Sequence, residues 1–202
     1  VKAVLLLPPF YYKNVEEEGV VEYFKKIVEQ VGENSLKYLL YNIPQISGIS
    51  ISTGIIKKLI KLYPSNFVGM KDSSGDINNM LKIIQSFKDF SLFSGSDILA
   101  QEICKKGGAG AITATSNISG KLISYIINNY NNEKNINNFQ DLQVQIRSTL
   151  FSNEPISTLK AFLSVKNNEK SWNKVLPPLS TINDPKNNKT VMDLIELIKK
   201  ME

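Results

Sequence analysis

The stretch FVGMKDSSGD, residues 67–76, joins a short apolar run to a polar turn that contains glycine. A brief apolar run bounded by a turn is typical of a strand buried in a parallel sheet. Lysine is rarely buried, so Lys71 at the end of this run requires a physical reason. One reason is chemical, because a desolvated lysine loses its proton more easily and can then attack a carbonyl carbon to form a Schiff base. The alternatives are that Lys71 reaches solvent or pairs with Asp72.

Four more apolar runs of strand length surround this segment, and helical patterns separate them. In these patterns apolar residues recur at spacings of three and four, as at Val20, Phe24 and Ile27. Small polar residues that favour helix N-caps occur at Ser52, Asp76, Asp97 or Ser96, and Ser119. The further strands are predicted at residues 4–7, 38–43, 92–93 and 111–115. Five such repeats predict an α/β fold with a parallel sheet covered by helices on both faces.

The last third of the chain lacks strand signals. Residues 139–149, 155–165 and 191–201 have helical patterns, whereas residues 176–189 are rich in proline and asparagine and predict a loop. We therefore expect an α/β domain at residues 1–130 and a helical domain at residues 131–202. Five parallel strands form either an open doubly wound sheet or most of a (β/α)8 barrel. Val1 is not an initiator methionine and lies almost inside the first strand, which favours a barrel that lacks its beginning.

Composition excludes several classes of protein. The 202 residues are 42% hydrophobic and 21% charged, which is ordinary for a soluble globular chain. The net charge of +5 comes almost entirely from lysine, with Arg147 as the single arginine and no clustered basic face, so we expect no nucleic-acid partner. No apolar run approaches the roughly 20 residues of a membrane span, so we expect no membrane partner.

The chain contains one cysteine, Cys104, and no histidine. A disulfide within the chain is therefore impossible, which favours a reducing, cytoplasmic location. The absence of histidine excludes the usual zinc sites, histidine bases and Ser-His-Asp triads. Acid–base chemistry must then use lysine, tyrosine, aspartate or glutamate, and we expect neither a metal nor another cofactor.

The carboxyl ends of the predicted strands carry the candidate functional groups. In either parallel architecture these ends meet at one rim, which would gather Lys71, Tyr41 and the pair Tyr11 and Tyr12. A lysine amine and a tyrosine hydroxyl suit imine chemistry, because the hydroxyl can relay protons while the amine bonds a ketone. The alternatives are that Tyr41 packs in the core, that Tyr11 and Tyr12 are plain loop aromatics, and that Asp97 only caps a helix.

Five motifs in register resemble the dihydrodipicolinate synthase / N-acetylneuraminate lyase family of class I aldolases. They are PFYY at 9–12, YNIP at 41–44, GMKDSSGD at 69–76, SGSD at 94–97 and GGAGAI at 107–112. The resemblance extends over essentially the whole chain, from the fourth barrel strand onward. It implies a (β/α)8 TIM barrel, here about strands 4–8, with a C-terminal helical extension. It also implies a homotetramer, assembled as a dimer of dimers.

The resemblance also assigns roles to individual residues. It implies that Lys71 forms the Schiff base with pyruvate and that Tyr41 relays protons. Tyr11, with Tyr12 as its adjacent alternative, matches a tyrosine that neighbouring subunits exchange. The implied pocket contacts are backbone groups of Gly95 and Ile112 and hydroxyl-binding side chains of Ser73 and Asp97.

Three departures from the family pattern bear on activity and substrate. The first three strands are absent, and with them the turn that holds pyruvate's carboxylate. Ile46 stands where the synthases carry a carboxylate-gripping arginine, and Ile98 stands where the lyase branch carries a glutamate. We therefore expect a pyruvate-dependent aldolase or lyase of a 2-keto-3-deoxy sugar acid or related 2-keto acid, with pyruvate and an aldehyde as its small molecules. The alternatives are a dihydrodipicolinate synthase using aspartate semialdehyde and a non-catalytic binding or oligomerisation fragment.

Overall fold

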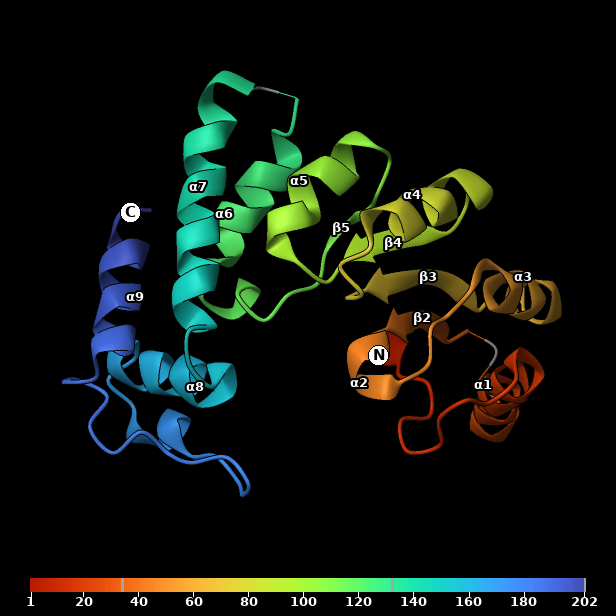
Figure 1. Ribbon diagram of the computed structural model, residues 1–202, viewed down its shortest axis with the longest axis horizontal. Coiled ribbons are helices and arrows are strands. Elements are labelled where there is room, and N and C mark those ends of the chain that lie inside the picture. The colour runs from red at the N-terminus through yellow and green to blue at the C-terminus, as the bar shows by residue number, and fades with distance from the viewer. Residues whose placement is uncertain (34, 132, 202) are drawn as a thin grey trace. The chain divides into compact units, whose positions relative to one another are not determined.

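The computed structural model describes residues 1–33, 35–131 and 133–201. The chain forms two compact units, Val1–Ile112 and Thr113–Glu202, shown in Figure 1. The first unit contains the sheet and the second is helical within the described residues. The division into domains at residue 130 stays a prediction.

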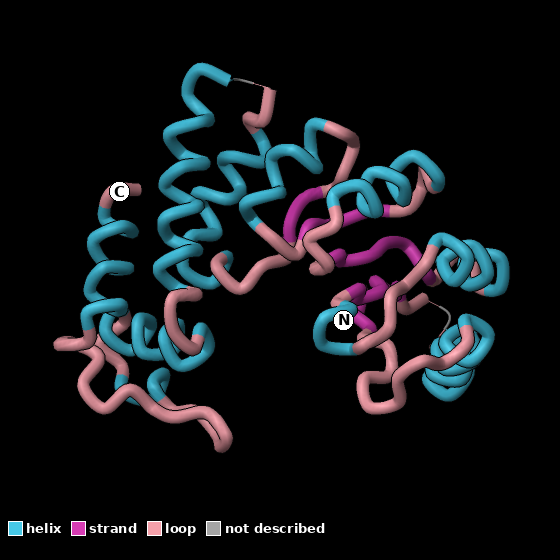
Figure 2. The backbone as a smooth tube through the Cα atoms, viewed as in Figure 1, coloured by secondary structure: helices cyan, strands magenta, loops and turns pink. Residues whose placement is uncertain are grey.

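All strands of the first unit belong to one parallel sheet with the order β1-β2-β3-β4-β5 (Figure 2). The strands are β1 Ala3–Leu6, β2 Lys37–Asn42, β3 Phe67–Asp72, β4 Ser91–Ser94 and β5 Gly110–Ala111. A doubly wound sheet reverses its strand order at a switch point, whereas a barrel adds each strand beside the previous one. The sequential order therefore selects the barrel architecture over the open sheet.

The helices between the strands begin close to the predicted residues. They are α1 Glu17–Val31, α3 Thr53–Leu62, α4 Ile77–Ser86 and α5 Asp97–Lys105, with a short α2 at Pro44–Ser47 that periodicity does not predict. The predicted caps of α3 and α4 are confirmed, because Ser52 Oγ accepts from Ile55 N at 3.1 Å and Asp76 Oδ1 accepts from Asn79 N at 3.0 Å. For α5, Ser96 occupies the N-cap position and Asp97 is the first helical residue.

The helices of the first unit pack on one face of the sheet. Alternate strand residues such as Tyr38, Leu40 and Met70 are fully buried in one core with Phe24 and Ile56 of the helices. The intervening strand residues face the other way and are half-buried or exposed, as the 37% exposure of Leu5 illustrates. The expected covering of both faces is therefore wrong for the described residues, because right-handed crossovers in sequential order place every helix on the same side.

The second unit consists of helices around their own core. They are α6 Ser116–Asn128, α7 Glu133–Leu150, α8 Pro155–Lys166, a 3-10 turn at Lys170–Asn173 and α9 Lys189–Lys199. Their apolar faces meet at Ile126, Ile146, Phe162 and Leu194, which confirms the predicted helical tail. None of the helices in the described part of the chain is long and apolar enough to cross a membrane.

Two local predictions fail near the start of this unit. The fifth strand ends at Ala111 rather than residue 115, because Thr113 and Thr115 bond each other through their hydroxyls at 3.0 Å instead of extending the ladder. Helix α6 begins at Ser116, and Ser119 forms a kink inside it at φ −124°. The predicted side-chain cap fails because the Ser119 hydroxyl donates to Thr115 O at 3.1 Å, although the part of α6 that carries Leu122 begins after Ser119 as expected.

Candidate active site

Lys71 and Tyr41 lie opposite each other on β3 and β2. The Lys71 Nζ donates a hydrogen bond to the Tyr41 Oη over 3.1 Å and lies 4.2 Å from the centre of the Tyr41 ring. Both side chains are half-buried on the face of the sheet that the helices leave uncovered. The Lys71 amine and the Tyr41 phenol therefore share one polar contact, and both side chains still reach solvent because they are only half-buried.

Asp72 occupies the opposite face of β3, because successive strand residues alternate. It is fully buried, and its Oδ2 accepts from Asn42 Nδ2 at 3.0 Å while its Oδ1 accepts from Ser74 N at 2.8 Å. The Asp72 carboxylate thus bonds residues behind the sheet, and the alternative of a Lys71–Asp72 ion pair is wrong. Sequence analysis missed this role of Asp72, although the alternation of strand residues already separated it from Lys71.

Ser73 and Gly95 meet at the rim next to this pair. Gly95 N donates to Asp72 O at 2.6 Å, which brings the two turns into close contact. A Cβ at Gly95 would lie 1.9 Å from Ser73 Oγ, so this position requires glycine for space. Beyond it, Ile112 is half-buried and its backbone N–H donates to Ser94 O at 2.9 Å. The structure therefore gathers Lys71, Tyr41, Ser73 and Gly95, with Ile112 directly after β5, which is two strands from β3.

Asp97 is buried within the first turn of α5, with 1% of its surface exposed. It lies at the positive end of a helix dipole, which favours a carboxylate there. The proposed contact between Asp97 and a substrate hydroxyl stays a prediction.

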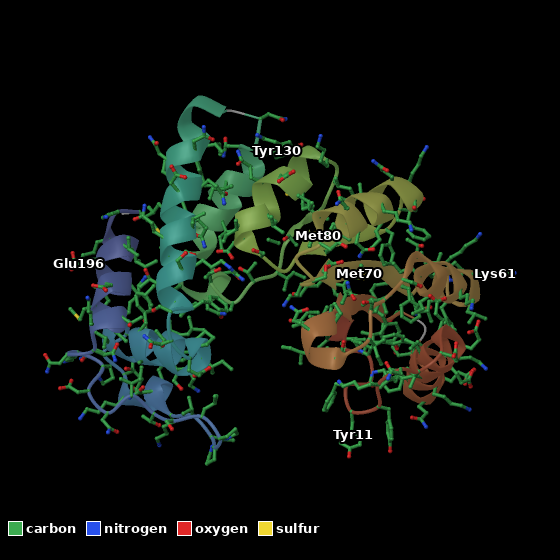
Figure 3. The ribbon with its side chains drawn as sticks, viewed as in Figure 1. Tyr11, Lys61, Met70, Met80, Tyr130 and Glu196 are labelled. Atoms are coloured by element: carbon green, nitrogen blue, oxygen red, sulfur yellow. The ribbon has the colours of Figure 1, made fainter. Side chains whose placement is uncertain are left out.

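Tyr11 is not part of this group of residues. Its side chain is 80% exposed and packs edge-on against Tyr12, which is 71% exposed, with ring centres 5.3 Å apart. Figure 3 shows Tyr11 on the loop after β1, pointing away from the sheet. The alternative of a plain loop aromatic and the role of Tyr11 between subunits are both compatible with this exposure, and the exchange between subunits stays a prediction.

Lys13 fixes the loop that carries the two tyrosines, a role that sequence analysis missed. Its Nζ donates to the backbone oxygens of Phe10 at 2.5 Å, Ser47 at 2.6 Å and Ile46 at 3.3 Å. Gly48, at φ 68°, leaves room for this side chain, because a Cβ there would lie 2.4 Å from Lys13 Cδ. Lysine is favourable at this end of α2, where helix carbonyls lack partners.

Ile46 and Ile98, the two side chains that depart from the family pattern, follow strands β2 and β4. Ile46 is 64% exposed and Ile98 is 41% exposed, so both apolar side chains face solvent. The neighbouring Gln45 donates through Nε2 to Ser73 O at 2.7 Å and thereby ties α2 to the turn after β3. In the described residues, cysteine, aspartate and glutamate form no group of three that could hold a metal ion.

Comparison with known proteins identifies relatives of this chain. The family model described as the dihydrodipicolinate synthetase family matches residues 1–197. An uncharacterized DapA-like lyase of Chloroflexus aurantiacus is 38% identical over 122 residues, which are 60% of this chain and 40% of that protein. The 4-hydroxy-tetrahydrodipicolinate synthase of Bacillus subtilis is 36% identical over 138 residues, 68% of this chain and 46% of the synthase. The matches thus span less than half of these curated relatives.

Solved structures match over nearly the whole chain. A dihydrodipicolinate synthase from Bacillus anthracis gives a TM-score of 0.85 at 26% identity, covering 100% of this chain and 66% of that one. A sialic acid aldolase from Ruminococcus gnavus, solved as a catalytic lysine mutant, gives a TM-score of 0.87 at 20% identity over 99% of this chain and 65% of that one. The second likeness concerns the fold alone, and the predicted barrel architecture is confirmed. The chain belongs to the dihydrodipicolinate synthetase family.

Proposed function

We propose that the protein is a carbon–carbon lyase that binds pyruvate as a Schiff base on Lys71. The observation that carries this proposal is the 3.1 Å hydrogen bond between Lys71 Nζ and Tyr41 Oη. A primary amine within one hydrogen bond of a hydroxyl that can relay protons supports general acid–base assistance to imine formation.

In the proposed mechanism the uncharged Lys71 amine adds to the keto carbon of pyruvate or of the 2-keto acid. The carbinolamine loses water to give a protonated imine, and Tyr41 Oη supplies and recovers the protons. In cleavage, Tyr41 Oη takes the proton of the hydroxyl beside the breaking carbon–carbon bond while the imine accepts the electron pair of that bond, so an aldehyde leaves and an enamine remains. Protonation of the enamine carbon and hydrolysis then release pyruvate and regenerate the amine.

As the substrate that is cleaved, we propose a hydroxylated 2-keto-3-deoxy acid. Ile46 is exposed at the position where a synthase would grip a carboxylate with arginine, and an apolar side chain cannot form that bidentate contact. Ser73 at the rim instead offers a hydroxyl, and Asp97 remains the proposed second partner of the substrate hydroxyls. The second candidate is a dihydrodipicolinate synthase, which is favoured by the 36% identity to the enzyme of Bacillus subtilis.

The proposal is tested by incubating the protein with pyruvate and sodium borohydride, followed by peptide mapping. We expect a stable adduct on Lys71, its loss in Lys71→Ala, and its retention in Lys61→Ala, whose side chain is exposed on α3 (Figure 3). A protein that folds but gains no adduct at Lys71 would instead be the non-catalytic fragment. Turnover of aspartate semialdehyde in preference to sugar-acid aldehydes would favour the synthase.

We further propose a cytoplasmic homotetramer in which Tyr11 of one subunit reaches another. The exposed Phe10, Tyr11 and Tyr12 support this, because a cluster of exposed aromatic side chains is typical of an interface. Sedimentation velocity of the wild type and of Tyr11→Ala tests the assembly. A monomeric wild type at micromolar concentration contradicts it.

A further inference from the structure

Two pairs of residues face each other across β2 and β3, one on each side of the sheet. Tyr41 pairs with Lys71, and the next residues, Asn42 and Asp72, pair with each other. The first pair lies on the uncovered face, and the second is buried beneath the helices. We infer that Asp72 is a positioning residue, which together with Asn42 fixes the register that holds Lys71 against Tyr41; this inference rests on the proposed function.

The Asp72 carboxylate connects three elements through four hydrogen bonds. Its Oδ2 accepts from Asn42 Nδ2 of β2 at 3.0 Å and from Asn79 Nδ2 of α4 at 3.2 Å. Its Oδ1 accepts from the N–H and the hydroxyl of Ser74, at 2.8 and 2.5 Å. Asn42 is itself held, because its Oδ1 accepts from Ile51 N at 3.0 Å. Buried hydrogen bonds to a carboxylate are stronger than neutral ones, so this network is a firm anchor.

An anchor is needed here because the β2–β3 ladder is irregular just before the reactive pair. Tyr38 pairs with Phe67 but Leu39 pairs with Gly69, so Val68 is an extra residue on β3. A shift of one residue turns every side chain to the opposite face. Such a shift after Val68 would bury the amine of Lys71 and place the carboxylate of Asp72 beside Tyr41. The Asn42–Asp72 bond is possible only in the register that keeps the amine at the site.

Asparagine cannot replace Asp72 without the loss of a hydrogen bond, because all four partners of the Asp72 carboxylate are donors. In Asp72→Asn one oxygen becomes an NH2 group that faces the NH2 of Asn42 or the donors of Ser74. Exchanging the two residues, in Asn42→Asp/Asp72→Asn, restores their mutual bond with donor and acceptor reversed. The exchanged pair still accepts from Ile51 N and from Ser74, and only Asn79 loses its acceptor. The exchanged pair is therefore compared with Asn79→Ala, which lacks the same hydrogen bond.

The test measures the rate constant of borohydride-trapped pyruvate labelling at Lys71 as a function of pyruvate concentration. We expect Asp72→Asn to lower the limiting rate by about tenfold to a hundredfold, because a displacement of about 1 Å has effects of that size. The pyruvate concentration for half-maximal labelling should change by less than about threefold, since Asp72 lies on the other face and touches no substrate. The exchanged pair should recover to the rate of Asn79→Ala, because these two variants lack the same single hydrogen bond.

The controls separate positioning from folding and from the proposed function. Asn78→Ala, one residue away on the exposed side of α4, should label at the wild-type rate, whereas Asn79→Ala should label a few times more slowly. If circular dichroism shows that Asp72→Asn does not fold, the comparison of Asn78→Ala with Asn79→Ala still tests the positioning role of Asp72. Equal rates in the wild type and in a folded Asp72→Asn, or in Asn78→Ala and Asn79→Ala, overturn the inference alone. A folded wild type without any adduct overturns the proposed function and the inference together.

Discussion

The amine of Lys71 and the phenol of Tyr41 are joined by a 3.1 Å hydrogen bond between directly opposed residues of two adjacent parallel strands. The two residues are thirty positions apart in the sequence, and the strand pairing alone brings them together. A contact held by a sheet is more rigid than one held by loops, which is what a proton relay requires. The site therefore depends on strand register as much as on the identity of its side chains.

Tyr41→Phe removes the hydroxyl and keeps the ring that contacts Lys71. We expect pyruvate labelling and turnover to fall by about a hundredfold, the scale of a lost general acid–base group, with little change in thermal stability. Tyr23→Phe is the matched control, because Tyr23 lies on helix α1 and is 37% exposed. Stopped-flow kinetics of imine formation measure the effect, and equal rates in the two variants contradict a relay by Tyr41.

Gly95→Ala adds a methyl group where a Cβ would lie 1.9 Å from Ser73 Oγ and 2.9 Å from Asp72 O. We expect the free energy of unfolding to fall by about 1–3 kcal/mol, because a backbone oxygen cannot move aside easily. Gly19→Ala is the control, since its Cβ meets nothing within 4 Å in helix α1. That change should stabilise the protein by about 0.5–1 kcal/mol. Urea denaturation of both variants shows whether the two effects have opposite signs.

Lys13→Met removes three hydrogen bonds from the loop that carries Tyr11 and Tyr12. We expect chymotrypsin to cleave at these exposed tyrosines about threefold to tenfold faster, because the loop opens more often without its anchor. Lys57→Met, an exposed lysine on α3, should leave the cleavage rate unchanged. Cleavage at the same rate in both variants would mean that Lys13 does not hold the loop.

Burial raises the pKa of the Cys104 thiol above its ordinary value. The unfolded thiol therefore ionises first as pH rises, and this part of the stability is present below the ordinary thiol pKa of about 8.5 and is lost above it. We expect the free energy of unfolding to decline more between about pH 8 and 10 in the wild type than in Cys104→Ala. Urea denaturation across that range measures the difference, and parallel pH curves contradict it.

Features that depend on residues close together in the sequence were predicted well, whereas contacts between distant residues were not. Ser52 and Asp76 cap their helices as expected, because a cap depends on residues three positions apart. Helix α2 was missed, since four residues are too short for a periodic pattern. Serine is a residue that favours helix N-caps, but the Ser119 hydroxyl donates backward to the backbone oxygen of Thr115.

The candidate site was predicted in part for the same reason. The alternation of strand residues and the family motifs suffice to bring Lys71 and Tyr41 to one rim. Asp72 was read only as a possible partner of its neighbour, because its four bonds depend on Asn42 and Asn79 in other elements. The sequence does not indicate the role of Lys13, because its three acceptors are backbone oxygens, which are the same in every residue type.

One face of the sheet carries Lys71 and Tyr41, and the other face packs against the helices. Side chains such as Leu39 and Phe93 can be exchanged without disturbing the methionines and aromatic rings beneath the helices. Natural variation can therefore retune which molecules this protein accepts while its scaffold stays the same. Proteins that share this barrel can then come to differ in their substrates while they keep the same fold.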